Sequence, residues 1–69
     1  MEFRLRKGSN YIELIQLLKV CNLASSGGQA QQMVVDKKVL LNGNIELRKR
    51  AKLKSGDKVE VLGQLIEIK

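Results

Sequence analysis

Hydrophobic and polar residues alternate at both ends of the chain, and this alternation predicts short strands. Phe3 and Leu5 lie between charged residues, a period of two that is typical of a half-buried strand. Near the C-terminus, residues 58–61 alternate strictly, and residues 65–68 follow after a turn expected at Gly63–Gln64. We therefore expect an N-terminal strand and a C-terminal hairpin over residues 58–69.

A second hairpin is predicted in the middle of the chain. Asn42–Gly43 separates the apolar run 39–41 from the run 44–47. Asn-Gly between apolar runs is the strongest short signal for a two-residue turn, because both residues tolerate the positive φ that a type I′ turn needs.

A period near 3.6 predicts a first helix over about residues 11–20. Asn10 and Glu13 have the spacing of a capping box, so we expect the helix to begin just after Asn10. The apolar residues at i, i+3, i+4 and i+7 share one face, which we expect to be buried. They are Tyr11, Leu14, Ile15 and Leu18.

A second, shorter helix is predicted after the segment Ser25–Gln29. Ser26 is a candidate N-cap with Gln29 three positions beyond it, again as in a capping box. The helix should end near Asp36–Lys37 and pack on the first through a small inner stripe. That stripe is Ala30, Met33 and Val34.

The order of these elements predicts an α+β fold. A short strand, two helices and about four strands follow one another with no repeat and no linker, which indicates two N-terminal helices packed on a small, mainly antiparallel sheet of about four to five strands. We expect residues 1–69 to form a single domain, and we expect a monomer.

The composition excludes several classes of function. The chain has no His, no Trp and no Pro, and it has one Cys, so we expect no zinc finger, disulfide framework, metal site or other cofactor. Without His the usual general base is missing, and we expect no catalytic residues. No apolar run reaches the length of a membrane span, so we expect a cytoplasmic protein without a membrane partner or a small-molecule substrate.

Positive charge is concentrated in one third of the chain. The net charge is +6 from 13 basic and 7 acidic residues. Residues 37–58 contain eight of the basic residues and only two of the acidic ones. In an extended chain Arg48, Arg50, Lys52 and Lys54 would share one face and could follow a phosphate backbone, although Lys also protects sheet edges from pairing. A polyanionic partner is thus indicated, and charge alone does not separate RNA from double-stranded DNA.

Four segments in this order resemble the RNA-binding domain named after ribosomal small-subunit protein four. They are Leu14–Lys19, Leu23–Ala30, Val39–Gly43 and Lys54–Val59. The resemblance covers roughly residues 11–61, and within the family the chain is similar to the short, stand-alone form of the bacterial YbcJ-like proteins. It implies an alpha-L motif, in which a helix-and-hairpin surface holds structured RNA such as ribosomal or transfer RNA.

The resemblance and the charge together predict an RNA-binding surface without a catalytic step. Many members of the family have Arg pairs at the start of the second helix, where this chain has Gly27 and Gly28. The free N–H groups of that helix start are themselves a phosphate site, or the segment is simply a capped helix start. The predicted RNA-binding residues are Ser25, Ser26, Gly27, Gly28, Gln29, Gln32, Lys37, Lys38, Asn42, Asn44, Arg48, Lys49, Arg50, Lys52 and Lys54.

Three single residues have simpler interpretations. We expect Cys21 to be a small buried hydrophobe and Tyr11 to be a core residue at a helix start rather than a base-stacking platform. Asn44 beside the turn could bind a ribose or a base, but the turn alone also explains it.

A rival function is a protein-interaction adaptor that docks an acidic partner on the basic edge. It would also use the apolar residues around Leu62 and Leu65. Binding that survives competing polyanions would favour the adaptor.

Overall fold

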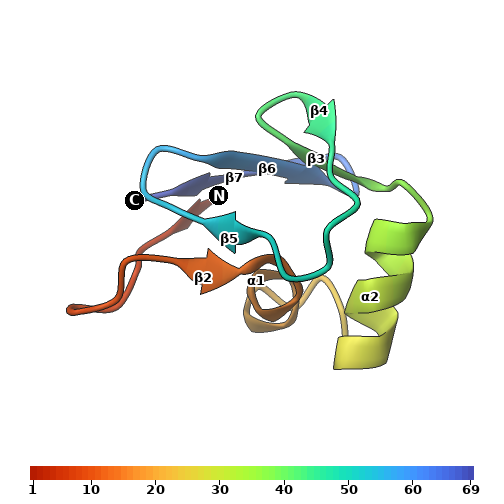
Figure 1. Cartoon of the computed structure of the whole chain (residues 1–69), viewed down its shortest axis with the longest axis horizontal. Coiled ribbons are helices and arrows are strands. Elements are labelled where there is room, and N and C mark those ends of the chain that lie inside the picture. Colours follow the sequence, from red (N-terminus) through yellow and green to blue (C-terminus); the bar gives the residue numbers. More distant parts are fainter.

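The computed structural model describes residues 1–69, and its main feature is a five-stranded sheet (Figure 1). Both helices and a second, two-stranded sheet lie on the same side of this sheet. The elements in chain order are β1 (Glu2–Phe3), β2 (Ile12–Glu13), α1 (Leu14–Val20), α2 (Gly27–Val35), β3 (Val39–Leu41), β4 (Asn44–Ile45), β5 (Lys52–Leu53), β6 (Lys58–Val61) and β7 (Gln64–Ile68).

The large sheet has the strand order β1-β7-β6-β3-β4 and is mainly antiparallel. Only β1 runs parallel to its neighbour, β7. The two-stranded sheet pairs β2 with β5 in antiparallel fashion. The predicted α+β class and the small, mainly antiparallel sheet are thus confirmed.

The first helix begins three residues later than predicted, and the predicted capping box at Asn10 does not form. Ile12–Glu13 forms strand β2 instead, and no side chain caps α1. The N–H groups of Leu14 and Ile15 donate to the carbonyl oxygens of Ala51 (2.9 Å) and Lys49 (3.3 Å). Backbone groups from a distant loop therefore satisfy the donors that a capping side chain would otherwise take.

Both helices end in the same hydrogen-bonded motif. After α1, Asn22 has φ 60°, and its N–H donates to Lys19 O while the next N–H donates to Leu18 O. After α2, Lys37 has φ 62° and makes the equivalent bond to Val34 O. These are the paired bonds of a Schellman motif, here with Asn and Lys in the position that Gly usually takes. The predicted end of the second helix near Asp36–Lys37 is confirmed.

The start and the inner face of α2 are as predicted, but the prediction of a shorter second helix is wrong, because α2 has nine residues and α1 has seven. The Ser26 hydroxyl accepts a hydrogen bond from the N–H of Gln29 at 3.1 Å, so Ser26 is the N-cap. The stripe formed by Ala30, Met33 and Val34 is buried. This stripe holds α2 against the core, and the polar residues of α2 face outward.

The Asn-Gly hairpin is confirmed, and the C-terminal turn is shifted by one residue. Asn42 and Gly43 have φ values of 51° and 88°, as a type I′ turn requires. The second turn is centred on Leu62–Gly63, with φ values of 51° and 74°, and not on Gly63–Gln64. The pairing of Val61 with Gln64 keeps the buried faces of both strands aligned, and this register forces Leu62 into the left-handed region.

The third predicted strand is shorter than expected, because β4 ends at Ile45 rather than at residue 47. The N–H of Glu46 still donates to Val39 O, but the Glu46 carboxylate accepts hydrogen bonds from Arg48, two residues further on. The chain leaves the sheet at this point.

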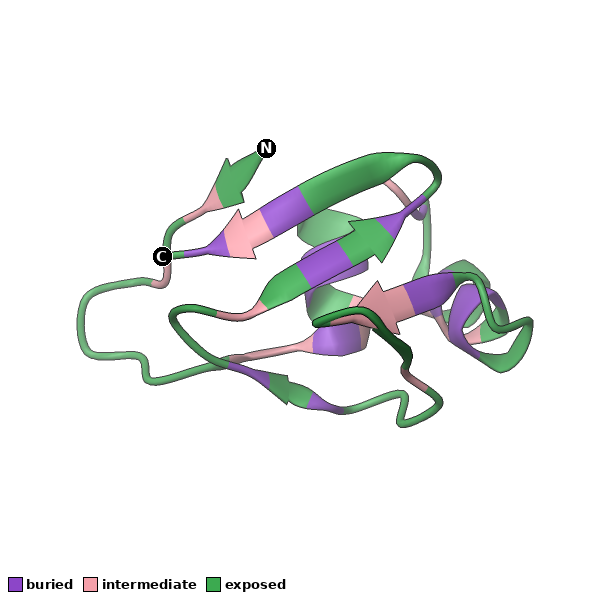
Figure 2. Cartoon of the chain, turned by 90° about the horizontal axis from the view of Figure 1, so that it is seen from above, coloured by how far each residue is buried: buried purple, intermediate pink, exposed green.

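The core consists of apolar side chains only. Fourteen residues are buried, and none of them is polar or charged. Burial alternates along β6, as Figure 2 shows. Leu14, Leu17 and Leu18 are the buried residues of α1, so Leu17 was missed and Tyr11, which is 43% exposed, was wrongly placed in the core. Cys21 is half-buried against the core, and burial raises the pKa of its thiol.

Neither helix has the length and hydropathy that a membrane crossing requires.

We predict that the fold depends on the apolar residues within the basic region. Leu53 is fully buried, so Leu53→Ala should lower the free energy of unfolding by about 2 to 5 kcal/mol. Leu47 is 56% exposed, and Leu47→Ala should change it by no more than about 0.5 kcal/mol. Urea denaturation followed by circular dichroism measures both, and equal losses would contradict the assigned burial.

Candidate nucleic-acid interface

The predicted binding residues come from four places in the fold. They lie in α2 and just before it, just after its end, in the β3–β4 hairpin, and in residues 48–54, which we call the basic stretch. Residues 46–51 and α2 lie at the same end of the molecule in Figures 1 and 2.

The basic stretch is not the continuous extended row that alternation predicted. The N–H of Ala51 donates to Arg48 O at 3.2 Å, and this turn places Lys49 and Arg50 at its tip. Only Lys52 and Leu53 are in a strand. The predicted row of four cations on one face is therefore wrong for Arg48 and Arg50, which lie in the turn. All four cations are nevertheless exposed.

Two buried residues hold the basic stretch on the core. Ala51 is 3% exposed and Leu53 is fully buried, while the cations beside them point to solvent. Pairing of β5 with β2 adds backbone hydrogen bonds, and the carbonyls of Lys49 and Ala51 cap α1. Lysine and arginine side chains are thus presented from a backbone that is fixed at several points.

Arg48 is engaged with a carboxylate of the same loop. Its Nε lies 3.1 Å from Glu46 Oε2, a terminal guanidinium nitrogen donates to Oε1 at 3.1 Å, and the Arg48 N–H donates to Oε2 at 2.9 Å. The Glu46 side chain is only 12% exposed. The hydrogen bonds from the Arg48 side chain, followed by those from the backbone and the positive charge, hold the pKa of Glu46 below its usual value.

Lys52 lies over an aromatic ring. Its Nζ is 5.0 Å from the centroid of the Tyr11 ring, a cation–π contact on the surface. Lys49, Arg50 and Lys54 form no ion pair, so their charges are available to a polyanion.

The Asn42 side chain already has structural partners. Its Nδ2 donates to Asp57 Oδ1 at 3.1 Å, and its Oδ1 accepts from the N–H of Lys58 at 2.9 Å. The other Asp57 oxygen accepts from the N–H of Lys54 at 2.8 Å. Asn42 therefore joins two turns, whereas Asn44 is exposed on β4 without a side-chain hydrogen bond.

The start of α2 presents backbone donors to solvent. Gly28 is exposed and Gly27 half-buried, and the first N–H groups of a helix have no acceptor within it. Gln29 Oε1 accepts from both the N–H (2.6 Å) and the hydroxyl (2.7 Å) of Ser25, so the reciprocal bond of the predicted capping box goes to Ser25 rather than to Ser26. Gln32 is held by Asp36 through a 2.9 Å hydrogen bond.

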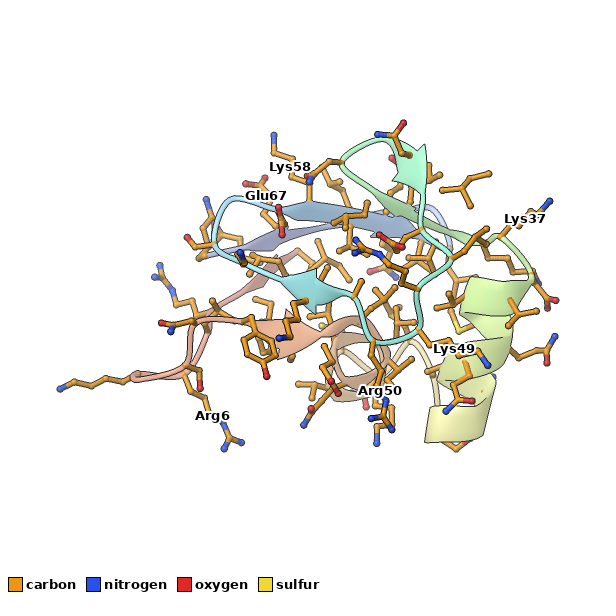
Figure 3. The ribbon with its side chains drawn as sticks, viewed as in Figure 1. Arg6, Lys37, Lys49, Arg50, Lys58 and Glu67 are labelled. Atoms are coloured by element: carbon orange, nitrogen blue, oxygen red, sulfur yellow. The ribbon has the colours of Figure 1, made fainter.

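The remaining cations lie on different sides of the molecule. Lys37 and Lys38 are exposed where α2 meets β3. Figure 3 shows Arg50 projecting away from the large sheet on the helix side, while Lys58 projects from its opposite face. The structure thus separates Lys58 from Arg50, although both lie in the same basic third of the sequence.

Sequence reasoning assigned no binding role to Arg4 and Arg6. Both are exposed and neither forms an ion pair. The available signal was a charge count, because residues 3–12 contain three basic residues and no acidic one.

Two helices packed on one side of a small sheet, next to an anchored loop with exposed, unpaired cations, define a compact α+β module. The chain belongs to the S4 domain family, which matches residues 3–69.

Two relatives carry the name YbcJ. This chain is 33% identical over 58 residues to YbcJ of Escherichia coli (strain K12), covering 84% of this chain and 83% of the relative. A protein of Shigella flexneri, described as uncharacterized YbcJ, matches to the same extent. The solution structure of YbcJ from E. coli, described as revealing an alpha-L motif involved in RNA binding, is similar with a TM-score of 0.72 and 33% identity, covering 97% of this chain and 84% of that one.

We predict that the Glu46–Arg48 pair contributes stability only while Glu46 is charged. Because folding lowers the pKa of Glu46, its contribution is present above the unfolded value of about 4.3 and is lost as the pH falls through the folded value. Glu46→Gln should therefore have a lower melting temperature than the wild type at pH 7, and this difference in melting temperature should shrink as the pH is lowered. Thermal melts across this range measure it. Glu60→Gln, an exposed β6 position without an ion pair, is the control, and a difference that persists at the lowest pH would contradict the assignment.

Proposed function

We propose that this chain is an RNA-binding module that holds structured RNA on the basic stretch and the start of α2, without a catalytic step. Three observations support it: the S4 family match, the description of the E. coli YbcJ structure as RNA-binding, and the net charge of +6. Ribosomal or transfer RNA is the class of partner that we propose, and residues 1–69 would act as one unit.

The observation that carries the proposal is the anchoring of unpaired cations beside free helix donors. Lys49 and Arg50 stand at the tip of a turn whose carbonyls are bound to α1, so their backbone is ordered before any ligand arrives. A fixed backbone reduces the entropy lost on binding. Phosphate contacts of this kind set the position of an RNA but give little sequence information, so recognition would rest on the shape of a folded RNA.

The surface offers two kinds of phosphate contact. The Arg50 guanidinium can take two phosphate oxygens at once, whereas Lys49 and Lys52 act as mobile point charges. The N–H groups of Gly27 and Gly28 act only at hydrogen-bond distance, assisted by the positive end of the helix dipole. The first kind attracts RNA over a longer range, and the second kind would fix one phosphate.

Replacing the two cations at the tip of the turn should weaken RNA binding and reduce its salt dependence. For Lys49→Gln/Arg50→Gln, the slope of log K against log salt should become shallower by about 0.7 to 0.9 for each phosphate that the variant no longer neutralises. Filter binding to a short RNA hairpin, repeated with a DNA hairpin of the same sequence, measures the slopes and the preference for RNA.

The matched control is Lys7→Gln/Lys58→Gln, which removes the same charge elsewhere. Its slope should stay close to that of the wild type. Equal effects in both double variants would mean that net charge matters rather than this surface. Binding to an acidic protein that polyanions fail to displace would instead favour the adaptor.

Gly28→Asp should lower RNA affinity without lowering stability. A Cβ at this position would meet only Ser26 Oγ, at 3.9 Å, and a carboxylate near a helix N-terminus is favourable for the helix. It would repel a phosphate at the same place. Gly28→Asn is the neutral control, and filter binding at low salt with thermal melting separates the two effects. Unchanged binding by Gly28→Asp would mean that α2 does not contact RNA.

A further inference from the structure

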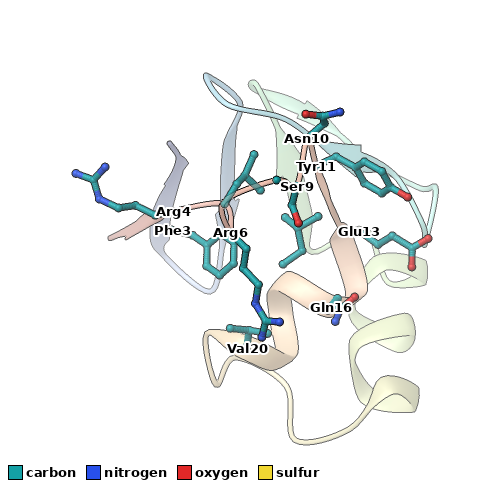
Figure 4. A pocket seen from close by; sticks show the side chains of 12 residues that line it. Phe3, Arg4, Arg6, Ser9, Asn10, Tyr11, Glu13, Gln16 and Val20 are labelled. Carbon is teal, nitrogen blue, oxygen red and sulfur yellow. The ribbon is translucent and has the colours of Figure 1, made fainter.

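A hollow of about 760 Å³ lies between the N-terminal segment and α1, away from the tip of the basic stretch (Figure 4). Residues 3–13 form most of its wall, and Gln16 and Val20 of α1 complete it. Its volume is in the range that small ligands occupy in proteins. Neither the predicted binding residues nor the proposed function gives this hollow a role.

The hollow combines an apolar surface with an unpaired guanidinium. Phe3 and Val20 supply apolar surface, and Val20 is 54% exposed although it belongs to a core helix. Figure 4 shows the Arg6 side chain directed along the hollow toward α1, whereas Arg4 points away. Arg6 forms no ion pair. The one acidic residue of the wall, Glu13, points away from Arg6 in the same view, and so does the Tyr11 ring.

Tyr11 connects this hollow with the basic stretch. It lines the hollow, is 43% exposed, and carries Lys52 Nζ 5.0 Å from its ring centroid. Lys52 belongs to β5, which pairs with β2 in the register Glu13↔Lys52. The two-stranded sheet therefore connects the wall of the hollow with Lys52 of the basic stretch.

These groups match one chemical class of ligand. A guanidinium binds phosphate with two hydrogen bonds, and an exposed aromatic ring stacks on a base. The bases of a paired stem are stacked on both faces, so only an unpaired segment can use both groups.

We propose that the hollow receives a short unpaired segment that extends from the RNA helix held by the basic stretch. Arg6 binds one of its phosphates, Tyr11 stacks on one of its bases, and Lys52 moves from the ring to a neighbouring phosphate. This inference rests on the proposed function, because the basic stretch must hold the RNA first.

The test compares two RNA hairpins with the same stem, one blunt and one with a short single-stranded extension. The wild type should bind the extended hairpin about tenfold more tightly. Arg6→Gln and Tyr11→Ala should remove this gain and leave binding of the blunt hairpin unchanged, whereas Tyr11→Phe should keep it. Lys7→Gln removes a neighbouring charge outside the hollow and should also keep it.

The single tyrosine gives an independent readout, because the chain contains no tryptophan. Its fluorescence should be quenched by the extended hairpin and much less by the blunt one. Equal affinity and equal quenching for both hairpins would overturn the role of the hollow while leaving the proposed function intact. Failure of both hairpins to bind would overturn the proposed function and this inference with it.

Discussion

The fold and the candidate site are joined by two hydrogen bonds at the start of α1. Leu14 N–H donates to Ala51 O, and Ile15 N–H donates to Lys49 O. A helix of seven residues is far too short to persist alone in water, so α1 exists because its leucines are buried and its first donors are satisfied by the chain around the basic stretch. The same carbonyls hold the turn that carries Lys49 and Arg50. Formation of the helix and positioning of the cations are therefore coupled.

The separation of polar from apolar groups explains how a chain of this size keeps a functional surface. Its buried core contains no polar side chain, and no buried side-chain donor or acceptor lacks a partner. Stability thus comes from aliphatic packing, and most surface charges are free for binding. Some polar side chains instead hold the fold. Among them, Glu46 orders the loop before Arg48, and Asn42 joins two turns. A residue in the predicted binding set need not bind RNA when its hydrogen bonds already hold the fold.

The sequence alone was sufficient to predict those parts of the structure that depend on neighbouring residues. The Asn42–Gly43 turn and the Ser26 cap each follow from two adjacent or nearly adjacent residues, and the inner stripe of α2 follows from helical spacing. It was insufficient where distant segments decide. Strand β2 is too short to show a hydrophobic period. It forms only because β5, which follows both helices in the sequence, pairs with it in the register Glu13↔Lys52.

The same contrast explains the remaining errors. A cap made of backbone carbonyls leaves no mark in the sequence, so Asn10 looked like a better helix start than Glu13. Leu62 is not a turn residue by composition, and sheet register alone puts it in the turn. Of the candidate site, the location of the charge was predictable, but the pairing of Arg48 and the hollow beside Arg6 depend on tertiary contacts. Local chemistry thus predicted which residues could bind RNA, and only the assembled fold shows which of them still have unused donors and charges.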